Sequence, residues 1–171
     1  MIGKIELWLN ILHYCIYKMD YKLHMFSNKI NPFVLIGKLP AVKRKFEEQG
    51  TTLLDTTNKI WTDKRFGFGI MISGGAIVGF IMFFLWGLIS TFLGYLGVYF
   101  FVKPIYVFIY VILSYTLCHF TVFKGEKYIK YFKKLDKRSK SEKWKYALLS
   151  LLFVVGSVAL WLYSFRFLPK L

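Results

Sequence analysis

Residues 66–102 read FGFGIMISGGAIVGFIMFFLWGLISTFLGYLGVYFFV and carry no formal charge. Lys103 interrupts this stretch, and residues 104–123 are again uncharged. A helix needs about 20 apolar residues to cross the hydrocarbon layer of a membrane. The region from 66 to 123 is therefore long enough for two membrane-spanning helices joined by a turn.

The turn is expected at residues 91–97, which hold the only pair of glycines near the middle of the block. This placement predicts spans at 67–90 and 98–123. Two shorter spans joined by a Phe- and Tyr-rich loop in the membrane interface are the alternative. A third uncharged stretch predicts a further span at 146–165.

The distribution of Lys and Arg predicts how these spans are oriented. Residues 1–65 hold 11 of the basic residues and the loop 124–145 holds 10, whereas the segments on the opposite side of three spans hold only 3. All nine acidic residues also fall in the two basic segments. We therefore expect an all-α integral membrane protein with the N-terminus inside and the C-terminus outside.

Composition agrees with this class. Of the 171 residues, 56% are hydrophobic and 20% are aromatic, and the formal net charge is +15. These values exclude an ordinary soluble domain and a disordered chain. The two cysteines, Cys15 and Cys118, exclude a disulfide framework. We expect a cytoplasmic helical segment at 1–65, with no cleaved secretory signal, and a transmembrane domain at 66–171.

The first 25 residues show the spacing of an amphipathic helix. Trp and Tyr beside Lys are typical of a helix that lies on a membrane surface. Packing of the same stripe on the protein's own surface or on a partner is the alternative. The apolar stripe assigned to this membrane-surface helix comprises Ile5, Trp8, Leu9, Leu12 and Ile16.

Residues 31–65 predict short helices. Asn31-Pro32 ends the first helix, and Pro40 suits the first turn of a helix over 41–49. Gly50 is placed to cap that helix at its C-terminus. A further helix is expected over 52–61.

The loop 124–145 combines many lysines with an apolar face, which predicts a helix rather than an irregular loop. Ser141 is expected to cap the start of the third span. The lysines favour contact with anionic lipid headgroups, although charge that serves only to fix topology remains an alternative. The headgroup residues are Lys127, Lys130, Lys133, Lys134 and Lys137.

Small residues on the first span predict close helix packing. One helical face carries Gly69, Ser73, Ala76 and Gly87. The pair Gly75 and Gly79 forms a GxxxG motif on a neighbouring face. The partner helix belongs either to this chain's own bundle or to another chain. The predicted interface residues are Gly69, Ser73, Gly75, Ala76, Gly79 and Gly87.

Candidates for chemistry are few. Lys103 is expected to extend to the outer headgroups, and Cys118 and His119 are adjacent on a helix and so point about 100° apart. No HExxH, GxSxG or phosphate-binding loop is present, and no carboxylate lies in a span. We expect no catalytic site, no metal and no cofactor.

These observations favour a non-catalytic multi-pass subunit or scaffold of a larger membrane assembly. A homo-oligomeric pore or membrane-perturbing effector is the alternative. The expected partners are anionic lipids and other membrane protein subunits or further copies of the chain, whereas nucleic acid is not favoured. A bacterial inner membrane fits the charge asymmetry best, with the mitochondrial inner membrane as the alternative.

Overall fold

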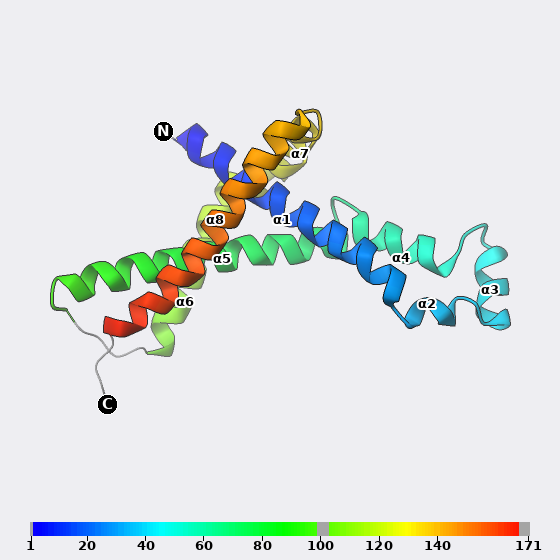
Figure 1. Cartoon of the computed structure of the whole chain (residues 1–171), viewed down its shortest axis with the longest axis horizontal. Helices are drawn as coiled ribbons and strands as arrows, with labels where there is room; N and C mark the ends of the chain where they lie inside the picture. Colours follow the sequence, from blue (N-terminus) through cyan, green and yellow to red (C-terminus); the bar gives the residue numbers. More distant parts are fainter. Residues whose placement is uncertain (1, 99–102, 168–171) are drawn as a thin grey trace. The chain divides into compact units, whose positions relative to one another are not determined.

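The computed structural model describes residues 2–98 and 103–167, and all regular structure in these ranges is helical (Figure 1). Two short turns, the π-helical η1 (His119–Phe123) and the 3-10 η2 (Lys124–Glu126), connect α6 to α7, and a 3-10 turn η3 (Phe165–Phe167) follows α8. The α-helices are α1 (Ile2–Ile30), α2 (Phe33–Ile36), α3 (Pro40–Glu47), α4 (Leu53–Thr62), α5 (Phe68–Tyr95), α6 (Pro104–Cys118), α7 (Lys127–Asp136) and α8 (Lys140–Ser164).

Three helical segments are long and apolar enough to cross a membrane: Phe68–Tyr95, Pro104–Asp136 and Lys140–Phe167. The second of them comprises α6, η1, η2 and α7. The predicted all-α class with three candidate membrane-spanning helices is therefore confirmed. The helix bounds differ from those expected, because α5 continues beyond residue 90 to Tyr95 and α6 starts at Pro104. Residues 99–102, which fall in the expected second span, lie outside the described residues.

The structure at the C-terminus of α5 explains why this helix continues beyond residue 90 before the chain turns. Gly97 adopts a positive φ of 75°, and the N–H of Val98 donates to the carbonyl of Leu93 at 3.0 Å. The N–H of Gly97 donates to the carbonyl of Gly94 at 3.1 Å. This pair of bonds is the Schellman motif that ends many helices. Gly94 is still helical, and its missing Cβ leaves room for the ring of Phe167.

The chain divides into two compact units, one of residues 16–74 and one of residues 1–15 with 75–171. In the 16–74 unit the second half of α1 packs on α4. The indole of Trp61 donates to Asp20 Oδ2 at 3.0 Å and stacks on the ring of His24 at 4.3 Å between centroids. The hydroxyl of Tyr17 donates to the carbonyl of Thr62 at 3.0 Å.

Helix α3 forms as its sequence predicts. Pro40 occupies the first turn, and Lys43 and Arg44 pair with the glutamates four residues further on. Gly50 has a φ of 66° and takes part in the bonds that close the helix, so its predicted capping role is confirmed. Thr52 caps α4 by accepting a bond from the N–H of Asp55 at 3.0 Å.

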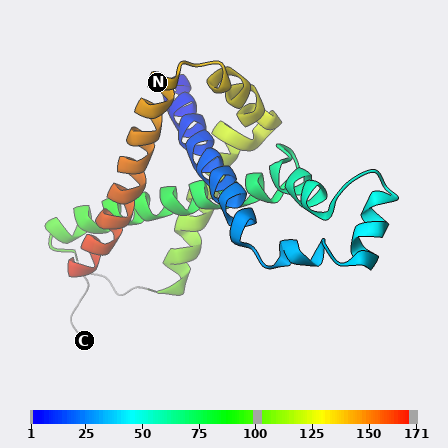
Figure 2. The same ribbon diagram turned by 45° about the vertical axis from the view of Figure 1, so that its right-hand side comes forward.

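In the unit of residues 1–15 and 75–171, α8 crosses α5 obliquely in both ribbon views (Figures 1 and 2). A Cβ added at Gly87 would lie 2.8 Å from backbone atoms of Leu160 and Trp161, so the two backbones meet at this glycine. Phe83 stacks on Trp161 at 4.6 Å between ring centroids. On the other side of α5, Trp86 stacks on Tyr110 of α6 at 5.3 Å.

Helix α8 begins earlier than expected, and its cap is Ser139 rather than Ser141. The Ser139 hydroxyl accepts from the N–H of Glu142, and the Glu142 carboxylate accepts from the N–H of Ser139, both at 3.2 Å. This reciprocal pair is a capping box, which requires Glu or Gln three residues after the cap. Ser139 meets that requirement, whereas the residue three positions after Ser141 is Trp144, which cannot accept the bond.

Candidate functional site at the contact of α1 with α7

The first half of α1 packs on the chain itself. Leu9 and Leu12 are each only 1% exposed, and Ile16 is also buried. Trp8 is half-buried and meets Phe153 of α8 edge-on at 4.6 Å between ring centroids. Of the stripe expected at the membrane surface, only Ile5 remains exposed. Leu9, Leu12 and Ile16 therefore follow the alternative, in which the stripe packs against protein.

Side chains from other elements cap the backbone carbonyls of η1, the turn that ends α6. The last carbonyls of any helix lack partners within that helix. Here the amide of Asn10 donates to the carbonyl of Thr121 at 2.9 Å, and the ammonium of Lys127 donates to the carbonyl of Phe120 at 3.0 Å. Asn10 is fully buried, so α1 supplies a polar cap in the interior of the unit.

His13 lies next to Asn10 on the inner face of α1 and is also fully buried. Its ring contacts those of Phe123, Tyr128 and Phe132, with centroids 5.9, 5.6 and 5.2 Å away. Burial among these rings lowers the pKa of His13 from 6.5 to about 4. The imidazole is therefore neutral at physiological pH.

Polar pairs join α1 to α7 on either side of this buried core. The Glu6 carboxylate accepts from Lys127 Nζ at 2.8 Å and from the Tyr131 hydroxyl at 3.0 Å. The bond from Lys127 is the main reason that the pKa of Glu6 is lowered. At the other end of the contact, the Tyr14 hydroxyl donates to Asp136 Oδ1 at 2.8 Å.

The chain reverses sharply before α7, which allows that helix to fold back on α1. Gly125 and Glu126 have φ values of 68° and 53°. A left-handed conformation suits glycine but costs about 1–2 kcal/mol in other residues. Tyr128, Phe132 and Leu135 then form the buried face of α7, in agreement with the predicted apolar face.

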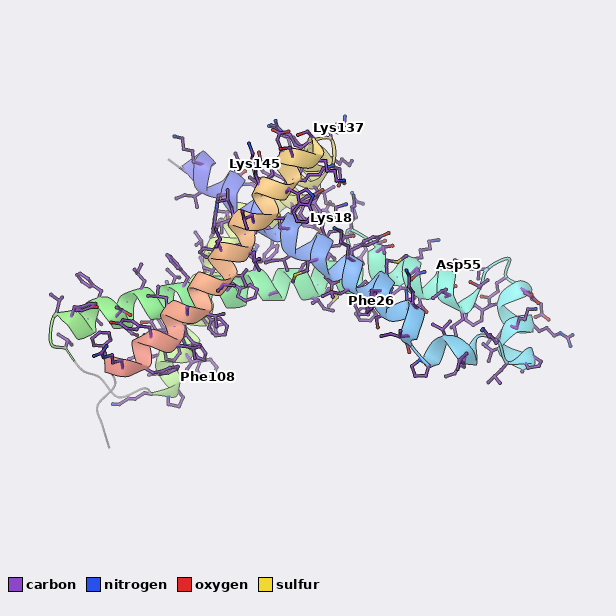
Figure 3. All side chains as sticks on the ribbon, viewed as in Figure 1. Lys18, Phe26, Asp55, Phe108, Lys137 and Lys145 are labelled. Carbon is purple, nitrogen blue, oxygen red and sulfur yellow. The ribbon has the colours of Figure 1, made fainter. Side chains whose placement is uncertain are left out.

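The orientation of α7 separates the five lysines assigned to headgroups. Lys127 is half-buried and bound to Glu6. The other four are exposed and lie at positions i, i+3, i+4 and i+7 of the helix. This spacing places them on one face, so they form a single stripe on the outer side of α7. The corner that α7 makes with the start of α8 carries Lys137 and Lys145 (Figure 3). The outer stripe, called the lysine stripe below, comprises Lys130, Lys133, Lys134 and Lys137.

The small residues of α5 do not act as one surface. Gly87 packs on α8, and Ser73 is buried. Gly69 lies in the 16–74 unit, where an added Cβ would be 3.0 Å from Asp20 Oδ2 and from the carbonyl of Trp61. Ala76 is exposed. A Cβ added at Gly75 or Gly79 would meet nothing within 4 Å, so the GxxxG motif is not covered by the described parts of this chain.

The serines of the spans face the interior of the chain. Three on α8 are spaced seven residues apart, at 150, 157 and 164, and the last two donate to the carbonyl three residues earlier at 2.8 and 2.6 Å. Small side chains of this kind let helices approach closely. The buried serines are Ser73, Ser90, Ser114, Ser150, Ser157 and Ser164.

The sequence contained a signal for part of the α1–α7 site. Asn10 and His13 interrupt the apolar stripe at positions that face inward, and a polar residue at such a position needs a buried partner. For Asn10 that partner is the carbonyl of Thr121, and no side-chain pattern reveals a backbone acceptor. The pairing of Glu6 with Lys127 joins residues 121 positions apart, which local spacing does not predict.

The side chains at the α1–α7 contact meet one another through hydrogen bonds and ring contacts. Within residues 2–98 and 103–167, no group of three or more His, Cys, Asp or Glu side chains could hold a metal ion. Cys118 is fully buried at the end of α6, while the ring of His119 lies against Tyr115 and Phe120. Comparisons with protein families, with curated proteins and with solved structures found no match to this chain.

Proposed function

We propose that this chain is a non-catalytic, three-span subunit or scaffold of a larger membrane assembly. The observation that carries the proposal is the open GxxxG face of α5, where Gly75 and Gly79 have no neighbour for an added Cβ. Small residues in spans are typical of close contact between helices. Gly87 makes such a contact within the chain, so the motif at Gly75 and Gly79 is available to a second membrane protein.

The low burial of the spans supports the same proposal. Only 28%, 28% and 17% of the most apolar windows of the three candidate spans are buried within the chain. The rest of their surface faces lipid or other subunits. Polar side chains on such outer surfaces would favour the pore alternative, and the serines buried inside the chain do not supply them.

The proposed setting is the inner membrane of a bacterium, with the N-terminus and α7 in the cytoplasm and the C-terminus outside. The positive-inside rule supports this orientation. The lysine stripe of α7 then faces anionic headgroups of the cytoplasmic leaflet. Impermeant labelling of single cysteines on spheroplasts should reach position 171 and should not reach position 134.

Substitution of Gly79 by isoleucine tests the interface. An added Cβ meets nothing within 4 Å in the isolated chain, whereas a branched side chain keeps a partner backbone away. We expect Gly79→Ile to weaken association about tenfold or more, which corresponds to about 1.4 kcal/mol. The measurement is the mass of the assembly extracted in mild detergent, together with the proteins that co-purify.

Gly156→Ile is the matched control, because Gly156 is also open but lies on α8 outside any GxxxG motif. It should leave the assembly unchanged. An assembly of unchanged mass and composition in Gly79→Ile would overturn the proposed interface. A ring that contains only this chain would favour the pore instead of the subunit.

A further inference from the structure

The second half of α1 presents an apolar stripe that the described parts of the chain leave uncovered. Its members recur at steps of four, three and four residues, which places them on one helical face. Phe26 is labelled in Figure 3. The stripe, called the α1 outer stripe below, comprises Met19, Leu23, Phe26 and Ile30, which are 55%, 58%, 61% and 71% exposed.

The opposite face of the same helix is fully engaged. Tyr17 and His24 are buried there, Asn28 donates to Asn58 Oδ1 at 2.6 Å, and His24 Nε2 lies 3.0 Å from the same oxygen. This polar network and the bond from Trp61 to Asp20 hold α1 on α4. The α1 outer stripe therefore cannot turn inward without breaking the network.

Basic residues border the α1 outer stripe. At 3.6 residues per turn, Lys22 and Lys29 lie about 60–90° around the helix from the centre of the stripe, and both are exposed. A helix with an apolar face and lysines at its edge places the former among acyl chains and the latter at phosphates. Long lysine side chains can extend from the edge of such a helix to the phosphates.

The same unit contains the start of α5, where the longest apolar stretch of the chain begins. Phe66 is 83% exposed, and Met71 is also exposed. Helix α1 lies directly against this region, because a Cβ added at Gly69 would be 3.0 Å from Asp20 Oδ2. If α5 enters a bilayer, this contact holds the part of α1 around Asp20 beside the start of α5.

We infer that the α1 outer stripe lies in the membrane interface and that its occupant is the anionic lipid of the bilayer that α5 enters. The inference rests on the proposed membrane location. It assigns the surface contact to residues 19–30 of α1, in place of the half around Leu9 and Leu12, which is buried within the chain. The exposed lysines at the edge of the stripe and the contact of α1 with the start of α5 both point to lipid.

The test uses single cysteines that carry a nitroxide spin label in the full chain. The background is Cys15→Ser with Cys118→Ala, after its assembly size has been matched to that of the original chain. The protein is reconstituted in vesicles of phosphatidylcholine with a minority of phosphatidylglycerol. Collisions with oxygen, which concentrates in lipid, are compared with collisions with a water-soluble nickel chelate.

We expect a severalfold higher oxygen-to-nickel ratio at positions 19, 23, 26 and 30 than at the matched control positions 22 and 29 of the same helix. High nickel accessibility at position 26 would overturn the inference in favour of a water-exposed stripe. Low accessibility to both reagents would overturn it in favour of a protein cover, either a partner or a second copy.

Position 108 separates failure of this inference from failure of the membrane proposal. Phe108 is exposed on α6, within a candidate span, and is labelled in Figure 3. It should behave as a lipid-facing position whatever α1 does. Nickel accessibility at 108 would contradict the membrane location itself, whereas nickel accessibility only on α1 would contradict the α1 outer stripe alone.

Discussion

The side-chain amide of Asn10 lies 2.9 Å from the backbone carbonyl of Thr121 and donates a hydrogen bond to it. The two residues are 111 positions apart, and both are buried. The same amide donates to the carbonyl of Glu6, one turn earlier in α1, at 2.8 Å. This one side chain thus connects the N-terminal helix to η1, the turn that follows α6.

Replacement of Asn10 by leucine should destabilise the protein by about 1–3 kcal/mol, because the carbonyl of Thr121 loses its donor in a buried place. Denaturant titration in detergent, followed by circular dichroism, measures the change. Lys4→Leu introduces the same side chain at an exposed position of the same helix and should have little effect. Equal stability of the two variants would contradict the capping role of Asn10.

Because the pKa of the buried His13 is lowered, we expect the protein to lose stability in mild acid. The pKa of this histidine in the folded chain is about 4, below the ordinary value of 6.5. The unfolded chain therefore binds a proton that the folded chain does not, and stability falls as the pH drops from about 6.5 towards 4. The maximum loss is about 3 kcal/mol. Thermal midpoints measured across this range should decline more steeply than those of His13→Phe.

Glu6 contributes in a different pH range, so the two groups can be separated. The bond from Lys127 lowers the pKa of Glu6 below 4.5. Its contribution is therefore complete above pH 4.5 and is lost only as the pH falls further. A decline between pH 6.5 and 4.5 that persists in His13→Phe would show that another group is responsible.

The ion pair of Glu6 with Lys127 should contribute little free energy. The two side chains keep 21% and 37% of their exposure, and pairs in contact with water typically stabilise by less than about 1 kcal/mol. A double-mutant cycle of Glu6→Gln and Lys127→Met should give a coupling of about 0.5 kcal/mol. A coupling of several kcal/mol would mean that the pair is far better shielded than its exposure indicates.

The lysines of α7 should differ in how strongly they retain anionic lipid. Lys134→Gln removes a charge from the lysine stripe and should weaken retention by about 1 kcal/mol. Lys127→Gln should weaken it less, because Glu6 already neutralises that ammonium. Native mass spectrometry of the protein with bound phosphatidylglycerol compares the two. Equal losses would indicate that total charge alone matters.

Gly87→Ala should disturb the contact between α5 and α8. The added methyl would lie 2.8 Å from backbone atoms of Leu160 and Trp161, and backbone cannot yield as a flexible side chain does. Overpacking of this kind costs about 1–3 kcal/mol. The thermal midpoint in detergent measures the loss, and Gly75→Ala, where space is open, is the control.

Features that depend on neighbouring residues could be predicted from the sequence. Uncharged stretches of sufficient length identified the three candidate spans, and Pro40 and Gly50 marked the limits of a short helix. The predicted cap of α8 was wrong because serine alone does not define a capping box. Glu142 stands three residues after Ser139, and this spacing was the better signal.

Features that depend on contacts between distant segments could not be predicted. An apolar stripe has the same residue pattern whether lipid or protein covers it, so the sequence alone left open whether Leu9 is buried within the chain, as the structure shows it to be. Likewise, GxxxG spacing does not reveal whether Gly79 has a partner. The reversal at Gly125 and Glu126 decides both which face of α7 is buried and which lysines stay outside.

The serines at 150, 157 and 164 have a consequence for how α8 is aligned. Two of their hydroxyls are satisfied within their own helix, so these side chains attract neighbouring helices no more than alanines would. Inserting one residue before Ser157 would rotate the rest of α8 by about 100° and bring other side chains to the buried face that Ser157 and Ser164 now occupy, whereas inserting about seven would restore the same face after two turns. The small serines therefore determine the rotation of α8 about its own axis. Because they recur every seven residues, α8 should tolerate insertions or deletions only of about seven residues.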